Sequence, residues 1–231
     1  MIHKMMLNES PFDRMKNGVK TIEFRLFDEK RQLIKPGDKI EFSKLPDLQE
    51  QLLVDVLELY RADSFKDLFM ELYNDVNEAS SKAERMHEIY SEEEEQQYGV
   101  LGIKVKINVD DLKQSIEKFQ PFNEQEEVDK RIMLKCIDEF DDVLTRQNEH
   151  CHFTSSAFLL NKERTKVLMI YHNIYKSWAW TGGHADGDSD LLHVARKEAE
   201  EETGLSNLKL LSDGIYGLQI LTVDPHIKRG L

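Results

Sequence analysis

The sequence predicts an α+β protein of two units joined by helices, and three observations support this fold class. Short strand-like segments separated by turns dominate the chain as far as Asn108. A helical stretch follows, in which residues 124–147 carry an amphipathic pattern. Strand patterns resume at His152 and run into a double glycine and a helix rich in carboxylates. We therefore divide the chain into three segments: a first unit at 1–108, a helical connector at 109–150 and a second unit at 151–231.

The amino-terminal unit is predicted to be a small β-barrel. Its candidate strands alternate apolar and polar residues, and they are IEFRLF, KIEF, LLVDVLELY and GVLGIKVKI. Pro36-Gly37-Asp38 forms a turn between the first two strands, because proline fixes φ and glycine relaxes the backbone. Residues 63–97, between the last two strands, are helical and acidic. Mostly short strands with one helical excursion are typical of a small barrel.

Composition and charge indicate a soluble protein of the cytoplasm. The 231 residues include no apolar stretch of membrane-spanning length and no signal-peptide core at the amino terminus, so we expect no membrane association. Cys136 and Cys151 lack metal-binding spacing and are interpreted as thiols in a reducing compartment. The net charge of -13 excludes a protein that coats nucleic acid with its whole surface. Residues 1–40 nevertheless carry nine Lys or Arg against six Asp or Glu, which permits a local basic surface.

Three glutamates in the carboxyl-terminal unit have the spacing of a cation site. Glu198, Glu201 and Glu202 stand at i, i+3 and i+4 of a predicted helix, so their side chains share one face. Their mutual repulsion indicates that a cation normally lies over them. Carboxylate ligands favour Mg²⁺ or Mn²⁺, which completes its coordination with water and substrate phosphates. The residues that dock the helix on a core are expected on the neighbouring face: Leu192, Ala195 and Ala199.

The segment around these glutamates, GHADGDSDLLHVARKEAEEETGL from Gly183 to Leu205, resembles the Nudix box. The family pattern is Gly, five residues, Glu, seven residues, then Arg-Glu-apolar-x-Glu-Glu-x-Gly-apolar. Here Ser189 replaces the first glutamate and Lys197 replaces the arginine, while Gly204 ends the helix. The resemblance implies an α/β/α sandwich. Residues 207–222, after the box, are expected to form a further strand. We expect the sandwich to be incomplete, because the later strands and closing helix of that fold have no counterpart before Leu231, and we expect the uncovered sheet to favour a homodimer.

The Nudix resemblance also implies a catalytic and metal-binding set. Catalysis falls to Glu198, Glu201, Glu202 and Lys197, and metal binding to the three glutamates with the Gly183 carbonyl. Lys197 takes over the pairing of the family's arginine with Glu201, although a lysine holds a carboxylate less rigidly. The general base stays open between Glu201 and Glu198.

Residues just before the box are assigned to the substrate, which the resemblance implies is a nucleoside diphosphate derivative. They are Trp178, Trp180, Gly182, Gly183 and His184. The two tryptophans are placed to stack a nucleobase or to wall the pocket, but tryptophan at strand ends is more often a packing residue with one polar edge in water. Their position beside the box makes the two interpretations about equal.

The amino-terminal unit resembles the ASCH domain, a PUA-like barrel associated with RNA. The resemblance rests on Gly18-x-Lys20-x-x-Glu23-x-Arg25, on the KPGD turn with Ile40 and Phe42, and on the segment YGVLGI. It implies RNA or nucleotide contact through Lys20 and Arg25. Some ASCH members hydrolyse acetylated cytidine with a lysine, a threonine and a glutamate; here Lys20 matches the lysine, but Glu23 occupies the position of the threonine. Exposed charges alternating along a strand face are the alternative interpretation of these residues.

Two principal functions follow from these resemblances, and a third is weaker. The first is a Nudix-type pyrophosphohydrolase that uses Mg²⁺ or Mn²⁺ to hydrolyse a nucleoside diphosphate linked to another group. The second is a nucleotide- or RNA-binding module that combines an ASCH domain with a degenerate, catalytically weak Nudix domain. Amide hydrolysis by the ASCH-like unit comes last, because Glu23 replaces the expected threonine.

Overall fold

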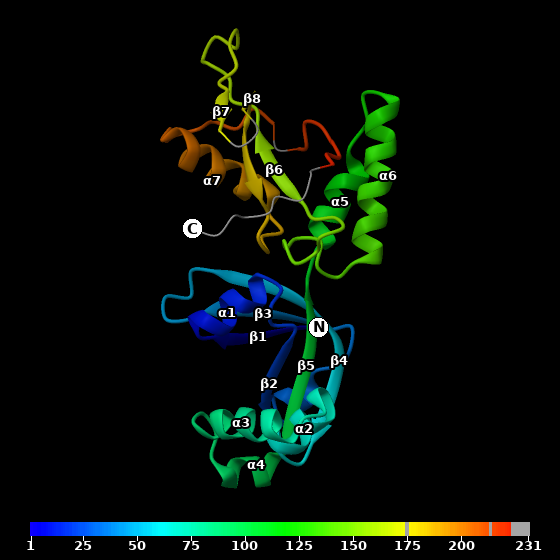
Figure 1. The fold of residues 1–231 in the computed structure, drawn as a ribbon, viewed down its shortest axis with the longest axis vertical. Helices are drawn as coiled ribbons and strands as arrows, with labels where there is room; N and C mark the ends of the chain where they lie inside the picture. Colours follow the sequence, from blue (N-terminus) through cyan, green and yellow to red (C-terminus); the bar gives the residue numbers. More distant parts are fainter. Residues whose placement is uncertain (174–175, 213, 223–231) are drawn as a thin grey trace. The chain divides into compact units, whose positions relative to one another are not determined.

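The computed structural model describes residues 1–173, 176–212 and 214–222, in two compact units (Figure 1). The amino-terminal unit comprises Met1–Asn108 together with the short segments Leu144–Glu149 and Asp186–Asp188. The remaining residues form the carboxyl-terminal unit. Residues 109–143, which the sequence analysis placed in a connector, therefore group with the carboxyl-terminal unit.

The amino-terminal unit is built on a five-stranded sheet of order β1-β3-β4-β5-β2. Its strands are β1 (Ile2–Leu7), β2 (Ile22–Leu26), β3 (Lys39–Lys44), β4 (Gln51–Ala62) and β5 (Val100–Ile107). β1 runs parallel to β3, and the other neighbours are antiparallel. The four strands expected from alternation are thus confirmed. β1 and the helix α1 (Glu9–Lys16) were not expected, because within β1 only Leu7 is buried and the alternation signal is weak.

The acidic stretch before β5 forms three short helices instead of one continuous helix. They are α2 (Phe65–Tyr73), α3 (Val76–His87) and α4 (Glu92–Tyr98), and a short 3₁₀ helix, η1 (Arg31–Leu33), lies between β2 and β3. Each of the three begins at a residue whose side chain accepts a backbone hydrogen bond: Ser64, Asp75 and Ser91. The three helices lie at one end of the sheet (Figure 1). Buried residues of α2 and α3 form one apolar cluster with Leu26 and Val100.

In the described residues of the carboxyl-terminal unit there are three helices and two small strand pairs. The helices are α5 (Asp110–Lys118), α6 (Glu124–Glu139) and α7 (Leu191–Thr203); the strands are β6 (Thr154–Ala157), β7 (Ile170–His172), β8 (Ser177–Ala179) and β9 (Thr181–His184). β6 pairs antiparallel with β9, and β7 pairs antiparallel with β8. α6 ends at Glu139, so the predicted helix over 124–147 was too long; residues 141–147 form turns and a bend instead.

Helix α7 lies against the β6–β9 pair through small side chains. Its buried residues are Val194, Ala195 and Ala199. Leu192, expected in this apolar stripe, is instead exposed. Asp190 caps the amino end by accepting from the backbone N–H of His193, and Gly204 ends the helix with a φ of +69°.

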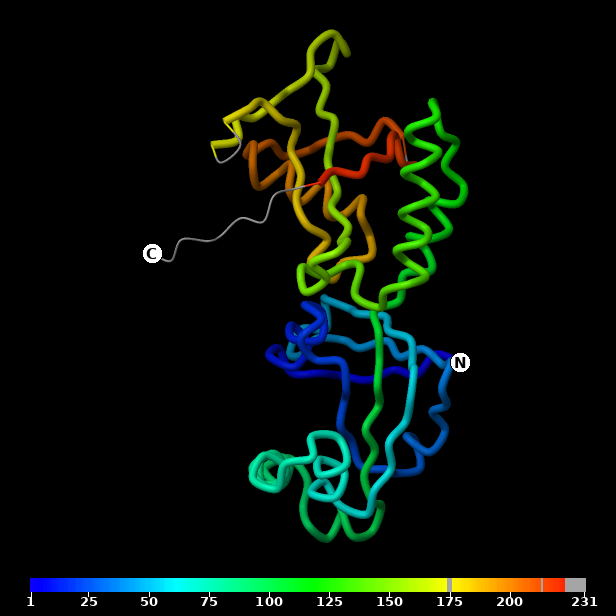
Figure 2. Tube along the Cα trace, turned by 45° about the vertical axis from the view of Figure 1, so that its right-hand side comes forward, coloured from blue at the N-terminus to red at the C-terminus, as the bar shows by residue number. Residues whose placement is uncertain are grey.

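The stretch after α7 was expected to form a further strand over residues 207–222, but its described residues belong to no strand. Part of it runs beside α6, in red against green in Figure 2. The backbone N–H groups of Leu218 and Ile220 donate to Glu126 and Asp129 of that helix, at 3.4 and 3.2 Å. Residues 223–231 lie outside the described part of the chain. Within that part, no helix combines the length and the apolar composition needed to cross a membrane.

Candidate functional site

A largely buried group of three charged side chains occupies β2 and the turn before it. The Glu23 carboxylate lies between two cations, with Lys20 Nζ at 3.3 Å from Oε2 and Arg25 Nε at 2.8 Å from Oε1. Glu23 is 5% exposed, and the side chains of Lys20 and Arg25 are 16% exposed each. The three residues are called the charged trio below. They are therefore not the solvated row of charges that strand alternation alone would permit.

Local backbone geometry positions the charged trio. The Lys20 backbone N–H donates to the Arg14 carbonyl at the end of α1, after Gly18 has turned the chain with a φ of +74°. Within β2, Glu23 and Arg25 are two residues apart and share a face of the sheet. Opposite them on β5 stand Ile103 and Leu101, both fully buried.

The charged trio interacts strongly in its apolar environment and carries more positive than negative charge. Apolar neighbours lower the local dielectric constant, so an unpaired carboxylate at Glu23 would be costly. Arg25 is also fixed at its far end, where Nη2 donates to the Met6 carbonyl of β1 at 2.8 Å. Two cations face one anion, so the charged trio has a net charge of +1 in a position that favours a further anion.

In the carboxyl-terminal unit, two of the predicted glutamates converge on the glycine pair of β9. The carboxylate of Glu198 packs on the Cα atom of Gly183, so tightly that any side chain at this position would collide with it. Glu202 accepts from the Gly182 backbone N–H at 3.1 Å. Close approach therefore requires glycine at both positions, because a side chain at 183 would meet Glu198 and one at 182 would meet Ser155 and Ser156 of β6.

The third glutamate points elsewhere. Glu201 lies 3.9 Å from Lys197 in an exposed i, i+4 pair, as the sequence analysis expected. Among the residues that the structure describes, no three His, Cys, Asp or Glu side chains are arranged to hold a metal ion. Glu198 and Glu202 thus reach the glycine pair while Glu201 pairs with Lys197, and the three-carboxylate Mg²⁺ site stays a prediction.

The aromatic residues beside the glycine pair form exposed contacts. Trp180 lies 5.6 Å from Phe158 between ring centroids, and Trp178 packs edge-on to Tyr171 at 5.5 Å. Trp178 is 65% exposed and Trp180 is 43% exposed, so both present ring surface to solvent. His184 instead packs beside His152 at 5.0 Å between ring centroids.

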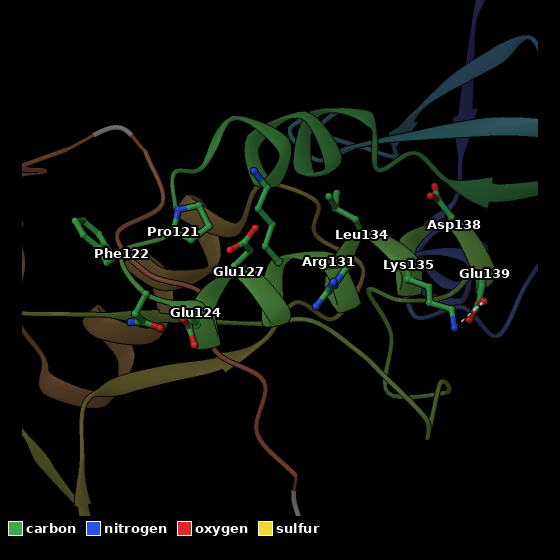
Figure 3. A pocket seen from close by; sticks show the side chains of 11 residues that line it. Pro121, Phe122, Glu124, Glu127, Arg131, Leu134, Lys135, Asp138 and Glu139 are labelled. Carbon is green, nitrogen blue, oxygen red and sulfur yellow. Dashed lines mark ion pairs between the residues drawn. The ribbon is translucent and has the colours of Figure 1, made fainter.

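A hollow of about 920 Å³ runs along α6 and the turn that precedes it (Figure 3). Its walls mix cations and carboxylates, including Arg131, Lys135, Glu127 and Glu139. Lys135 pairs with Glu139 at 3.5 Å across the hollow's edge. None of the predicted site residues lines it, and its mixture of four carboxylates and three cations selects no ligand class.

Comparison with known proteins identifies the amino-terminal unit. Residues 5–109 match the family model of the ASCH domain. The amino-terminal unit is an ASCH domain. Its five-stranded sheet fits the PUA-like half-barrel that the resemblance implied, and the charged trio lies within the matched residues. The match ends at residue 109, so the Nudix resemblance of the carboxyl-terminal unit stays a prediction.

Several solved structures are similar to parts of this chain. The hypothetical protein PH0355 is 32% identical with a TM-score of 0.41, over 47% of this chain and 100% of its own. Protein PF0455 from Pyrococcus furiosus is 30% identical with a TM-score of 0.35, over 46% of this chain and 97% of its own. The ASCH protein from Zymomonas mobilis is 17% identical with a TM-score of 0.30, over 58% and 94%. No curated protein matches the chain at a significant level.

The structure thus brings the predicted site residues together in two separate groups, one in each unit. Sequence reasoning missed that Glu23 is the centre of the charged trio, and treated it mainly as a departure from a catalytic pattern. The signal was present, since Lys20, Glu23 and Arg25 put an acid between two bases at i, i+3 and i+5. Only burial distinguishes this arrangement from a solvated strand face.

Proposed function

We propose that the ASCH domain binds a phosphate-bearing ligand, single-stranded RNA or a nucleotide, through Lys20 and Arg25. The observation that carries this proposal is the net charge of +1 held in the nearly buried charged trio. It accords with the excess of three positive charges over residues 1–40 in a chain that is otherwise strongly acidic.

Each member of the charged trio has a distinct role in this proposal. Glu23 stabilises both cations in the domain by occupying one side of each head group. Arg25 is held at both ends, so it presents a fixed planar donor group. Lys20 has one carboxylate contact and a compact ammonium, and it supplies the more adaptable charge.

The proposal is tested by titrating the full chain into fluorescently labelled single-stranded RNA while recording anisotropy. Lys20→Met and Arg25→Met should each weaken binding and reduce its salt dependence, because each removes a phosphate contact. Lys66→Met is the matched control, since Lys66 is an exposed lysine on α2 of the same unit. Equal binding by Lys20→Met, Arg25→Met and Lys66→Met would reject the charged trio as the binding site.

A second function is proposed for the carboxyl-terminal unit: metal-dependent hydrolysis of a nucleoside diphosphate linked to another group. The observation that favours it is that Glu198 and Glu202 both contact the glycine pair, Gly182 and Gly183. The Nudix resemblance implies that these glutamates and the Gly183 carbonyl bind the metal together. The contact between Lys197 and Glu201 does not oppose it, because an exposed pair at 3.9 Å contributes at most about 0.5 kcal/mol and is easily exchanged. In such an enzyme Mg²⁺ or Mn²⁺ would supply charge neutralisation of the diphosphate and an activated water.

This second function is tested by assaying phosphate release from a panel of nucleoside diphosphate derivatives with millimolar Mg²⁺. Glu202→Gln should abolish turnover while leaving the fold intact, since it removes a charge without changing shape. Glu200→Gln is the matched control, because Glu200 is an exposed glutamate on the same helix and lies outside the i, i+3, i+4 set. Turnover that survives in Glu202→Gln, or its absence from the unmodified chain on the whole panel, contradicts hydrolysis at this site.

The exposed rings of Trp178 and Trp180 are proposed to meet the base of that substrate. Trp180 directly precedes β9, two residues before Gly182, so its exposed ring lies close in sequence to the glycine pair. Stacking of a base on an aromatic ring contributes about 1–3 kcal/mol. Trp180→Ala should therefore raise KM at least tenfold more than Trp178→Ala.

A further inference from the structure

The two cysteines of the chain meet in the carboxyl-terminal unit. Cys136 lies in the last turn of α6, and Cys151 lies three residues before β6. Both thiols are reduced and partly buried, and Cys136 is close enough to Cys151 to interact with its side chain. Fifteen positions of sequence separate them, so their contact is set by the fold and not by the local chain.

The backbone around the two thiols is held in a fixed arrangement. The Phe153 N–H donates to the Val143 carbonyl at 2.7 Å, which binds the segment after α6 to the segment before β6. Phe140 directly follows α6 and His150 directly precedes Cys151, and their rings stack at 6.0 Å between centroids. The Phe140 N–H in turn donates to the Cys136 carbonyl. These contacts hold the end of α6, with Cys136, beside the segment before β6, with Cys151.

We propose that Cys136 and Cys151 form a reversible intramolecular disulfide when the protein meets a small-molecule disulfide such as glutathione disulfide. The bond would tie the end of α6 to the segment that leads into β6. β6 pairs with β9, with Ser155 opposite Gly183 and Ser156 opposite Gly182. Oxidation would thus restrain the strand pair that carries the glycines of the proposed hydrolytic site, although the proposal does not depend on that function.

The exchange proceeds in two steps whose atoms balance. The Cys136 thiolate attacks one sulfur of glutathione disulfide, so a mixed disulfide forms and one glutathione leaves. The Cys151 thiol then loses its proton to solvent and attacks the Cys136 sulfur, which releases the second glutathione. Two protein thiols are oxidised to one disulfide, and one glutathione disulfide is reduced to two glutathiones.

The environment of the two cysteines assigns the order of attack. Burial raises the pKa of the Cys151 thiol to about 12, and the hydrogen bond with Cys136 and the charges of Asp142 and Glu139 add to this effect. Cys151 therefore carries little thiolate at neutral pH and is a poor first nucleophile. Its role is to resolve the mixed disulfide, where adjacency to Cys136 compensates for its low reactivity.

The test treats the full chain with glutathione disulfide and follows intact mass, thiol content and peptide linkage. The unmodified chain should lose both titratable thiols, become lighter by two hydrogen atoms, and yield a Cys136–Cys151 linked peptide. Cys151→Ser should stop as a glutathione adduct on Cys136, and Cys136→Ser should react at least tenfold more slowly. The linked form should also melt at a higher temperature than the reduced form, and dithiothreitol should reverse the shift.

Three outcomes would overturn the proposal. The first is an unmodified chain that keeps glutathione adducts without forming the linked peptide. The second is a chain whose disulfides join separate molecules. The third is a chain whose thiols stay reduced although a control peptide containing a single cysteine is modified under the same conditions.

Discussion

The Glu23 carboxylate of the charged trio should stabilise the ASCH domain but weaken its attraction for phosphate, and Glu23→Gln tests both effects. The substitution keeps the shape of the side chain and removes its charge. Lys20 and Arg25 are then left partly buried without a counter-ion, at distances of 3.3 and 2.8 Å from the position of the lost charge. The domain should become less stable, while its attraction for phosphate should increase.

The expected loss of stability follows from the burial of the three side chains. Breaking a buried ion pair by removing one partner costs about 3–5 kcal/mol. The two cations are each 16% exposed and gain some hydration, which lowers the expected loss to about 2–4 kcal/mol. With the urea dependence of a domain of this size, this corresponds to a midpoint lower by about 1–2 M.

The expected gain in binding follows from the net charge of the charged trio, which rises from +1 to +2. One additional charge at ~10 Å from a phosphate, with an effective dielectric constant of about 40, contributes about 0.8 kcal/mol. RNA should therefore bind about fourfold more tightly at low ionic strength, and the advantage should shrink as salt rises.

The position of the two tryptophans makes the assay selective. Trp178 and Trp180 are the only tryptophans and both lie in the carboxyl-terminal unit, so urea titration by tryptophan fluorescence reports that unit. Far-UV circular dichroism reports both units. Glu23→Gln should lower the urea midpoint of the ASCH domain measured by dichroism and should leave the midpoint measured by fluorescence unchanged. A variant as stable as the unmodified chain would refute the buried-charge argument, and unchanged RNA affinity in a folded variant would refute the electrostatic part of the proposed function.

Three further predictions concern other parts of the chain. Hydrogen bonds from Lys16 at 3.1 Å and from Lys44 at 3.2 Å lower the pKa of Glu50. The ionised Glu50 therefore stabilises the fold above its unfolded pKa, and this stabilisation is lost as pH falls below about 4–5. Glu50→Gln should make the stability measured by dichroism less dependent on pH in this acid range, and Glu29→Gln should not. Millimolar Mg²⁺ or Mn²⁺ should raise the melting temperature of the carboxyl-terminal unit, and Glu202→Gln should remove the shift; a melting curve indifferent to the ions would favour the binding-module hypothesis. Exposed apolar side chains such as Tyr216 and Leu211 should promote self-association, and light scattering showing a monomer at all concentrations would contradict it.

The sequence predicts the strands of the ASCH domain well because their alternation reflects one buried and one exposed face. β3 and β4 follow this rule, with Ile40, Phe42, Val54 and Val56 buried on one face. β1 does not, since it is mostly exposed and its place at the edge of the sheet depends on parallel pairing with β3. Pairing between distant segments leaves no periodic trace in either segment, so it is not predictable from local pattern.

The length of α6 shows the same limit in a helix. Its apolar period continues to Leu144, and periodicity alone therefore predicts a helix over 124–147. In the structure the helix ends at Glu139, and Val143 and Leu144 are buried in an irregular segment. The Val143 carbonyl bonds to the Phe153 N–H instead of continuing the helix. A tertiary hydrogen bond thus replaces the helical one, and no residue near 139 signals the change.

The glutamates of α7 show how far spacing can define a site. With about 100° of rotation per residue, Glu202 lies about 40° from Glu198, whereas Glu201 lies about 60° away on the other side. In the structure Glu198 and Glu202 contact the glycine pair, and Glu201 pairs with Lys197. A single helix face at i, i+3 and i+4 is therefore wide enough to serve two partners. A cation placed between Glu198 and Glu202 would gain Glu201 only by displacing Lys197, so Lys197→Ala should strengthen Mg²⁺ binding if the three glutamates act together and leave it unchanged if only two of them do.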